Sequence, residues 1–400
     1  MPETVFWVLI IVIFYTYLGY GAILWILGGL KSLFSQGQGI PVGDYEPPVT
    51  LLVASYNEEA WVGEKIRNSL QLDYAAEKLS FLWITDGSND GSMNLIVESP
   101  RLSHLHLPER RGKAAAINRG MTFVKTEIVI LSDANTLLSP RAVKEMIPLF
   151  QDLKVGCVCG EKRVCGPEKD TATVAGEGTY WRYESWLKRQ EARVGSCVGA
   201  AGELFAIRRE LFRELEEDTL VDDFMISMRI ALDGYRIAYA PDAFAMETGS
   251  ADIGEDFKRR TRIAAGNLQA LLRIPQLLNP LKHGMLTFQY VSHKFLRSFV
   301  VPLCFGALIP INLLLLPERG FLYALLFLLQ TLFYLMAWAG YLLKERRLPS
   351  RVFFVPCYIV TMNLAALVGA FRYLTGKQSV LWEKAVRKQG FPEREEGEPR

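Results

Sequence analysis

Residues 49–59 read VTLLVASYNEE, an uninterrupted apolar run followed at once by polar side chains. Three later apolar runs have the same character: LSFLWIT at 79–85, TEIVILSD at 126–133 and VGCVCG at 155–160. Runs this short and apolar predict buried strands. Segments at helical spacing, such as EEAWVGEKIRNSL at 58–70, lie between them. Strands that alternate with helices predict an α/β fold with a mostly parallel sheet.

Polar side chains that follow three strands carry most of the chemistry. SYNEE at 55–59, DGSNDGS at 86–92 and SDANT at 132–136 each begin where an apolar run ends. In parallel α/β sheets, ligands bind beyond the carboxyl ends of the strands. We therefore expect one binding site at that edge of the sheet.

Apolar segments flank this region on both sides. Residues 6–30 carry no charge and are long enough to cross a bilayer, which takes about 20 apolar residues. They lack the basic start and cleavage site of a signal peptide, so we expect an uncleaved anchor; a buried core helix is the alternative. Further spans are expected at 299–316, 321–343 and 352–374, preceded by amphipathic interfacial helices at 268–294.

Basic residues predict which side of the membrane each segment faces. Lys31 follows the first span, and the loop KERRLPSR at 344–351 is strongly basic. By the positive-inside rule both belong in the cytoplasm, together with the α/β region. Three later spans would put the tail outside, yet residues 377–388 are also basic. Either one span is re-entrant or the tail is exported.

Composition and cysteine spacing exclude two kinds of site. The chain has 400 residues, half of them hydrophobic, and a net charge of only +2, so nothing suggests nucleic-acid binding. Cys157, Cys159 and Cys165 are clustered, but no second His or Cys group has zinc-like spacing. Ordinary buried thiols are therefore favoured over a metal centre.

A first group of residues suits a nucleotide. Asp86 and Glu58 each follow a strand, where they can hydrogen-bond a uracil and a ribose, although each is also a common turn or cap residue. Lys113 in RRGKAAAINRG stands at an expected helix start and suits a phosphate. It is not a P-loop lysine, because Leu107 occupies the position of the first P-loop glycine.

A second group suits a diphosphate and its cation. Asp133 and Asn135 alternate at the end of a strand and point the same way, so they could hold Mg²⁺ or Mn²⁺; an Asx turn is the alternative. Asp222 and Asp223 open a helical run, where adjacent acids are also ordinary dipole partners. The basic stretch KRRTRIAAGNLQ at 258–269 could clamp a pyrophosphate or face lipid headgroups.

Taken in order, these motifs resemble family 2 glycosyltransferases, most closely the membrane synthases of cellulose, hyaluronan and poly-N-acetylglucosamine. The shared elements are ASYNEE, DGSNDGS, GKAAAINRG, SDANT, GAAGELFAIRR, VDD and RRTRI. The resemblance implies a Rossmann-like, nucleotide-sugar-binding domain of GT-A type with a mostly parallel sheet, plus transmembrane helices. It also implies an inverting hexosyltransferase that uses Mg²⁺ or Mn²⁺.

The resemblance assigns a role to individual residues. Asp223, in the position of the family's T-E-D element, would be the general base. The donor side would consist of Tyr56, Glu58, Asp86, Lys113, Asp133, Asn135, Arg259 and Arg262, of which Asp133 and Asn135 would hold the metal. The acceptor side would consist of Trp181, Gly202, Glu203, Asp222 and Ile263.

The chain departs from the family pattern at two places. Asn135 replaces an acid, so Asp133 should carry most of the metal affinity. In the position of the family's Q-x-x-R-W, Arg262 keeps the arginine, while Arg259 replaces Gln and Ile263 replaces Trp. In polymerising members that tryptophan supplies a flat platform for the terminal sugar, so the similarity to processive enzymes is weaker here.

These inferences predict a multi-pass protein of the inner cell membrane. Its cytoplasmic domain would transfer sugar from a UDP-sugar to a growing polysaccharide; a non-processive enzyme with a lipid acceptor is the alternative. Expected partners are the donor, the acceptor, membrane lipids and accessory secretion subunits. The expected domains are an anchor at 1–31, a transferase domain at 45–255, basic and interfacial helices at 256–297, transmembrane helices at 298–375 and a tail at 376–400.

Two other classes of protein fit less well. A transferase-like sensor or scaffold would have broken catalytic positions, yet Asp86, Asp133, Asp223 and Arg262 are all present. A plain transporter would not need about 200 residues of α/β character between its spans.

Overall fold

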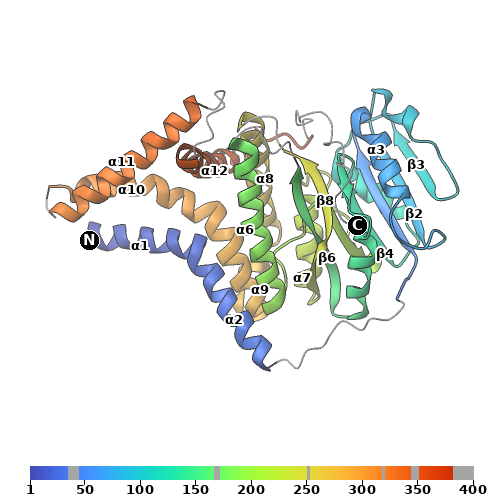
Figure 1. Cartoon of the computed structure of the whole chain (residues 1–400), viewed down its shortest axis with the longest axis horizontal. Helices are drawn as coiled ribbons and strands as arrows, with labels where there is room; N and C mark the ends of the chain where they lie inside the picture. Colours follow the sequence, from blue (N-terminus) through green and yellow to red (C-terminus); the bar gives the residue numbers. More distant parts are fainter. Residues whose placement is uncertain (35–44, 166–171, 250–252, 318–319, 344–350, 382–400) are drawn as a thin grey trace, which may run out of the picture.

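A mixed eight-stranded sheet forms the centre of the domain (Figure 1). The computed structural model describes residues 1–34, 45–165, 172–249, 253–317, 320–343 and 351–381. The strand order is β3-β2-β1-β4-β7-β6-β8-β5. The strands are β1 (Val49–Ser55), β2 (Leu79–Asp86), β3 (Leu102–Leu107), β4 (Ile128–Asp133), β5 (Thr136–Leu138), β6 (Val155–Cys165), β7 (Leu204–Arg208) and β8 (Arg236–Thr248).

The sheet is mostly parallel, as the sequence predicts. β1 pairs with β2 and β4, β2 with β3, and β6 with β8, all in parallel. β7 lies antiparallel between β4 and β6, and β5 is antiparallel to β8. The carboxyl ends of β1, β2 and β4 therefore meet at one edge, where their polar turns follow.

Helices cover both faces of the sheet. They are α3 (Glu59–Leu70), α4 (Lys113–Phe123), α5 (Ala142–Met146), α6 (Ala172–Val194), α7 (Asp222–Leu232) and α8 (Ile253–Arg273), with 3-10 turns at η2 (Gly91–Leu95), η3 (Ile147–Gln151), η4 (Arg209–Leu211) and η5 (Pro275–Leu278). All seven residues of β1 are buried. Leu52 and Ala54 pack into one core, whereas Leu51 and Val53 pack into the other, so this strand is apolar on both faces.

Four helical segments are long and apolar enough to cross a membrane, as the sequence predicts: Pro2–Leu33, Pro280–Leu315, Phe321–Leu342 and Val352–Leu374. They comprise α1 (Pro2–Phe14), η1 (Tyr15–Gly19), α2 (Tyr20–Phe34), α9 (Pro280–Tyr290), η6 (Val291–Val300), α10 (Val301–Leu315), α11 (Phe321–Leu342) and α12 (Arg351–Leu374). Figure 1 shows α1, α10 and α11 extending away from the sheet, beyond α6 and α8. The segment Pro280–Leu315 includes residues 280–294, for which the sequence predicts interfacial helices, and its helix is interrupted by non-helical backbone at Gly284.

Two π-helical segments meet where the first membrane helix reaches the domain. Tyr15 in η1 and Ser292 in η6 share a hydrogen bond of 2.7 Å between their hydroxyl oxygens. Directly after η1, the Tyr20 hydroxyl donates to the Glu191 carboxylate of α6 at 2.7 Å. The same carboxylate bonds His293 Nδ1 at 2.7 Å. These buried polar contacts hold the anchor, α6 and the second membrane segment together.

The last helix, α12, packs along α8 of the domain. The Arg260 guanidinium bonds the hydroxyl of Tyr358, and Gly369, eleven residues later, lies against the backbone of Thr261. Beyond α12, Leu381 lies beside Gly112, 3.9 Å from the position that a side chain on this glycine would occupy. The tail therefore returns to the domain at Leu381, which favours the re-entrant alternative. The basic loop at 344–350 and the tail from 382 lie outside the described residues.

Candidate active site

A buried carboxylate stands at the end of β2. Asp86 is 1 % exposed, and its Oδ2 accepts the backbone N–H groups of Arg111 (3.0 Å) and Gly112 (2.6 Å). Gly112 has a φ of +100°, which favours glycine at this turn. Among the described residues, none donates a hydrogen bond to Asp86 Oδ1, although Arg119 Nη1 lies 3.9 Å away. The site therefore offers one oriented acceptor oxygen to a ligand.

The turns after β1 and β2 are bonded to each other beside Asp86. Asn57 and Asn89 exchange hydrogen bonds of 2.8 and 2.9 Å. Glu58 is buried at the start of α3, and Tyr56 lies under the Arg110 guanidinium, 3.7 Å from its ring centroid. These predicted donor-side residues thus lie on turns held together at the same edge of the sheet.

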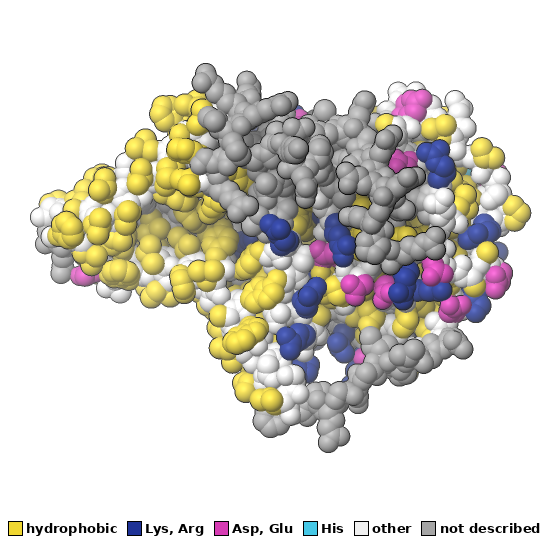
Figure 2. Space-filling view, in the orientation of Figure 1, with side chains coloured by type: hydrophobic (Ala, Val, Ile, Leu, Met, Phe, Trp, Pro, Cys, Tyr) yellow, Lys and Arg dark blue, Asp and Glu magenta, His cyan; other side chains and the backbone are white. Residues whose placement is uncertain are grey.

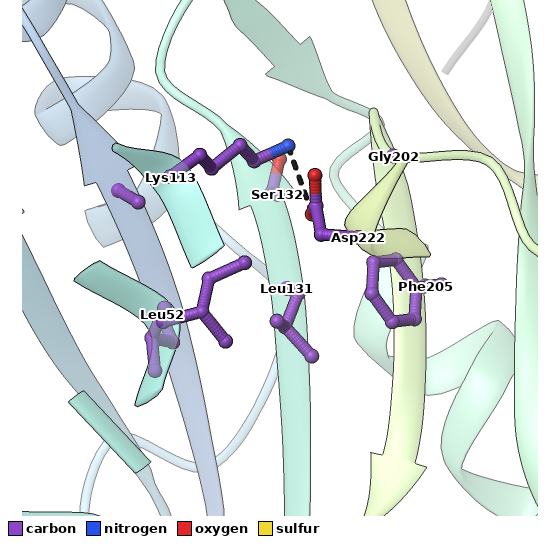
Figure 3. Close-up of a pocket in the computed structure, with 9 residues that line it drawn as sticks. Leu52, Lys113, Leu131, Ser132, Gly202, Phe205 and Asp222 are labelled. Carbon is purple, nitrogen blue, oxygen red and sulfur yellow. Dashed lines mark ion pairs between the residues drawn. The ribbon is translucent and has the colours of Figure 1, made fainter. Parts of the chain in front are cut away.

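Lys113 joins two acids that are far apart in the sequence, Asp133 and Asp222, and Figure 3 shows its ion pair with Asp222. It opens α4, and its Nζ lies 2.8 Å from Asp133 Oδ1 at the end of β4 and 3.2 Å from Asp222 Oδ2 at the start of α7. Burial disfavours the ammonium, but the two carboxylates outweigh it and raise the pKa of Lys113. Lys113 is therefore a fixed positive charge at the centre of this site.

A pocket lies directly beneath this ion pair, as Figure 3 shows. It is lined by Leu52, Ala54, Lys113, Ile117, Leu131, Ser132, Gly202, Phe205 and Asp222. In Figure 3 its apolar side chains from the central strands lie on one side, and Lys113, Ser132 and Asp222 lie on the other. Because water is poorly accommodated among the apolar side chains, charges beside them interact more strongly than they would in solvent.

Asp223, the predicted base, lies next to the lysine-bridged pair. Its Oδ1 accepts the backbone N–H of Phe224 at 2.8 Å. A side chain on Gly202 would begin 3.2 Å from Asp223 Oδ2, so this glycine keeps the carboxylate accessible. Burial and the neighbouring negative charge of Asp222 raise the pKa of Asp223 to about 7. A carboxyl group with such a pKa can accept a proton near neutral pH.

A second charged cluster lies beyond Gly202. The ammonium of Lys162, which is 2 % exposed, makes ion pairs with Glu203 and Glu247 and lies 4.7 Å from the ring centroid of Trp181. Arg259 Nη1 lies 3.7 Å from Glu247. Burial alone would raise the pKa of Glu203, but Lys162 outweighs it and lowers this pKa. The predicted acceptor residues Trp181 and Glu203 therefore meet around a buried lysine.

Helix α8 contributes the two predicted arginines of the donor side. Arg259 and Arg262 are three residues apart and share a face of the helix. Arg262 is close enough to Asp222 and Arg110 to interact electrostatically, and burial lowers its pKa. Ile263 is 43 % exposed on the same helix, so the described residues do not enclose it as a platform.

Two oxygen donors suit a divalent cation. Asp133 ends β4 and Asn135 lies in the turn that follows, and both are half-buried on either side of buried Ala134. Burial raises the pKa of Asp133 despite its ion pair with Lys113. Among the described residues, no three His, Cys, Asp or Glu side chains are grouped for a metal. One carboxylate and one amide therefore fit a hard cation whose other ligands are diphosphate and water.

Sequence reasoning missed three lysine or glutamate positions. Lys162 and Glu247 are charged residues inside β6 and β8, and such isolated charges within strands were a usable signal. Lys65 of α3 is completely buried and donates to Ser132 Oγ (2.7 Å) and Thr136 Oγ1 (3.2 Å). It holds both ends of the turn that carries Asp133 and Asn135. Nothing in its spacing along α3 distinguishes it from an exposed helix lysine, so the sequence offered no signal for it.

Comparisons with known proteins identify the family of this chain. A family model described as glycosyltransferase-like family 2 matches residues 47–266. Poly-beta-1,6-N-acetyl-D-glucosamine synthase of Staphylococcus aureus (strain COL) is 29 % identical over 270 residues, which are 63 % of this chain and 64 % of the relative. The synthase of the same name from Staphylococcus epidermidis is 27 % identical over 254 residues, covering 61 % and 58 %. The chain thus matches less than two thirds of the length of these relatives.

A solved structure has the same fold. A mannosyltransferase from Pyrobaculum calidifontis, in complex with GDP-Man and Mn²⁺, matches with a TM-score of 0.71 at 21 % identity. The match covers 94 % of this chain and all of the other. The GT-A architecture with membrane helices, expected from the motifs, is therefore confirmed.

Proposed function

Because the chain belongs to glycosyltransferase-like family 2, we propose that it transfers a sugar from a UDP-sugar to a growing polysaccharide with inversion at the anomeric carbon. The observation that carries this proposal is the Lys113 ammonium, 2.8 Å from Asp133 and 3.2 Å from Asp222. This ammonium can bind a diphosphate, and it connects two other elements. They are the turn that would hold the divalent cation and the helix that starts with Asp222 and Asp223. A nucleotide-sugar needs all three within its own length.

The nucleotide end of the donor lies over the turns after β1 and β2. Asp86 Oδ1, buried and without a hydrogen-bond donor among the described residues, accepts the N–H of a uracil. Tyr56 and Glu58 border the base and the ribose. Nearer the reaction centre, Lys113 and Arg262 neutralise the diphosphate, because both are positively charged and adjoin Asp222.

Asp223 is the general base. It takes the proton from an acceptor hydroxyl, the resulting oxygen forms a bond to the anomeric carbon, and the bond between that carbon and UDP breaks on the opposite side. The electron pair leaves with UDP. Asp223 has a pKa raised to about 7, so it can remove a proton near neutral pH and hold it until release.

Asp133 and Asn135 would hold the divalent cation, Mg²⁺ or Mn²⁺, together with the diphosphate. That ion would supply positive charge to neutralise the leaving diphosphate. Asp133 carries most of the affinity because it is the ionisable member of the pair. Lys65 fixes the turn from behind by bonding both Ser132 and Thr136.

The acceptor enters on the side of Gly202, Glu203 and Trp181. Lys162 holds Glu203 in its charged form, and Trp181 offers a ring to the apolar face of a sugar. A polysaccharide is the favoured acceptor because the similar Staphylococcus proteins are polysaccharide synthases. A lipid acceptor remains the second candidate, since Ile263 offers no aromatic platform for processive extension.

The proposed domains follow the expected ranges, with the anchor at 1–31, the transferase domain at 45–255, the basic and interfacial helices at 256–297, the membrane helices at 298–375 and a tail at 376–400. Four apolar helices make this a membrane protein. The transferase domain faces the cytoplasm, because Lys31 follows the anchor on the domain side. In a bacterium this is the inner membrane. Accessory secretion subunits would be further partners.

The purified protein tests this function when it is given a panel of labelled UDP- and GDP-sugars with Mn²⁺ or Mg²⁺. Polymer that grows with time and stays in the aqueous phase supports a polysaccharide synthase; label that extracts into organic solvent supports the lipid acceptor. Asp223→Asn should abolish transfer while leaving UDP binding within about twofold, since the amide keeps the shape but accepts no proton. Normal turnover by this variant, or no transfer from any donor, would overturn the proposal.

A further inference from the structure

We infer that α2 and α6 together form a binding surface for anionic lipid headgroups at the membrane interface. The two helices lie side by side over two turns. A side chain on Gly21 of α2 would collide with Trp186 of α6. Seven residues later, a Cβ added to Gly28 would lie 3.7 Å from the Cβ of Arg193. This close approach makes the exposed sides of both helices one continuous surface.

The exposed side of α6 is basic. Arg182, Trp186, Arg189 and Arg193 are spaced by four, three and four residues, so they form one line along the helix. The opposite side is buried through Glu184, Leu187, Gln190 and Glu191. Figure 2 shows Lys and Arg side chains gathered at this boundary, between the yellow projecting helices and the domain.

The exposed side of α2 is apolar. Its exposed large side chains are Ile23, Trp25, Ile26, Leu30 and Leu33. The helical segment Pro2–Leu33 has 32 residues, which at 1.5 Å each is about 48 Å, longer than the roughly 30 Å of a hydrocarbon core. The segment is therefore longer than the core, and its Lys31 end reaches the headgroup region. An apolar strip beside a basic strip at that depth matches acyl chains beside phosphates.

Two of the arginines on this line, Arg189 and Arg193, are available to a ligand. Arg189 and Arg193 make no ion pair with any carboxylate in the described parts of the chain, and Arg193 bonds only the Gln190 amide, at 3.3 Å. Lys31 adds a fourth positive charge where its ammonium bonds the Val194 carbonyl at the end of α6. A soluble anion would use the arginines alone, whereas a lipid surface also covers the apolar side chains of α2.

The inference depends on the membrane location and not on sugar transfer, so its test uses stability. The full chain is placed in nanodiscs of phosphatidylcholine, with or without about 30 % phosphatidylglycerol, and the melting temperature is measured. We expect a gain of several degrees with the anionic lipid, lost at about 0.5 M salt because exposed charges are screened. Arg182→Gln/Arg189→Gln/Arg193→Gln should lose at least half of the gain.

Two control variants keep the test decisive. Arg67→Gln/Lys125→Gln/Arg209→Gln removes the same charge from exposed positions elsewhere on the domain and should keep the gain. Arg182→Lys/Arg189→Lys/Arg193→Lys retains the charge and should also keep it. The inference is wrong if the first control loses the gain equally, if the α6 variant retains it, or if inorganic phosphate alone reproduces it.

Discussion

At the candidate active site, three acidic side chains surround one lysine, Lys113. Asp133 and Asp222 share its ammonium, and Asp223 adjoins Asp222 without a lysine of its own. A carboxyl group in that position retains its proton to higher pH, because ionisation would add a third negative charge to a buried site. The same crowding that makes Asp223 costly to ionise makes it an effective proton acceptor.

This arrangement predicts the pH dependence of the reaction. As the proposed general base, Asp223 must be deprotonated to accept the proton. Its pKa is raised to about 7, so kcat/KM should increase with pH up to about 7 and then level off. Glu203→Gln removes a nearby negative charge that also raises this pKa, and should move the midpoint to lower pH. A pH–rate profile for both proteins is the measurement, and identical midpoints would contradict it.

Lys65 predicts a pH dependence of stability. Complete burial lowers the pKa of Lys65 to about 7, whereas an unfolded lysine has a pKa near 10.4. Between these values the unfolded chain binds a proton that the folded chain does not, so stability should rise with pH over this window and be lowest below about 7. The slope contributed by one residue is at most about 1.4 kcal/mol per pH unit.

Lys65→Met should flatten that dependence, since a methionine fills similar space without the charge. Melting temperatures measured from pH 7 to 9 give the comparison with the unaltered protein. Lys125→Met, at an exposed lysine, is the control and should leave the slope unchanged. Parallel curves for the Lys65 variant and the unaltered protein would show that Lys65 is not titrating.

At the scale of elements, the contact between α8 and α12 depends on one glycine. A side chain at Gly369 would begin 2.8 Å from Ala264 Cβ and 3.0 Å from the Ala265 nitrogen. Gly369→Val should therefore separate the helices and destabilise the protein by about 1–3 kcal/mol, the usual range for overpacking.

The matched control is Gly306→Val in α10, where no described atom lies within 4 Å of the added Cβ. Thermal unfolding in detergent measures both. If the two variants melt together, the close packing of α12 on α8 does not contribute to stability.

The elements also differ in how far the sequence could predict them. Strands β1, β2 and β4 were predictable because each is apolar on both faces and ends in a polar turn. The antiparallel insertion of β7 between β4 and β6 was not, since strand order depends on packing rather than on any local pattern. The roles of Lys162 and Glu247 were not predictable for the same reason, because these two residues meet only when β6 and β8 are paired.

The membrane helices illustrate a second limit. Hydropathy identified α12 but could not distinguish an apolar surface that faces lipid from one that faces another helix. In the structure α12 packs on α8, while Val355, Leu364 and Phe371 stay exposed. The common edge of Asp86 and Asp133 followed from the topology of parallel strands, which is general. Lys113 and Asp222 begin helices, so the sequence placed them at the same site only through the family resemblance. Their catalytic roles stay predictions.

At the scale of the whole molecule, α12 decides where the tail lies. Since Leu381 is beside Gly112 of the transferase domain, the preceding residues should be on the same side of the membrane as that domain. A cysteine at Lys377, which is exposed, should react with an impermeant thiol reagent under the same conditions as a cysteine at exposed Lys125.

A cysteine at Phe321, at the start of α11, is the opposing control, because α10 and α11 carry this end away from the domain. The measurement uses a cysteine-free background in sealed cells and in opened ones. Labelling of position 377 together with position 321 in sealed cells would mean that α12 crosses the membrane after all.

The π-helical turn at Tyr15–Gly19 has a consequence for changes in chain length. The Tyr20 N–H donates to the carbonyl of Tyr15, five residues back instead of the four of an α-helix, so this turn accommodates one additional residue. Deleting a single residue here would remove the additional residue and restore regular winding, so α1 and α2 would keep their orientation relative to each other. A deletion within a regular α-helix rotates one half by about 100° relative to the other, whereas a deletion at this turn would leave the outer half presenting the same side to its surroundings.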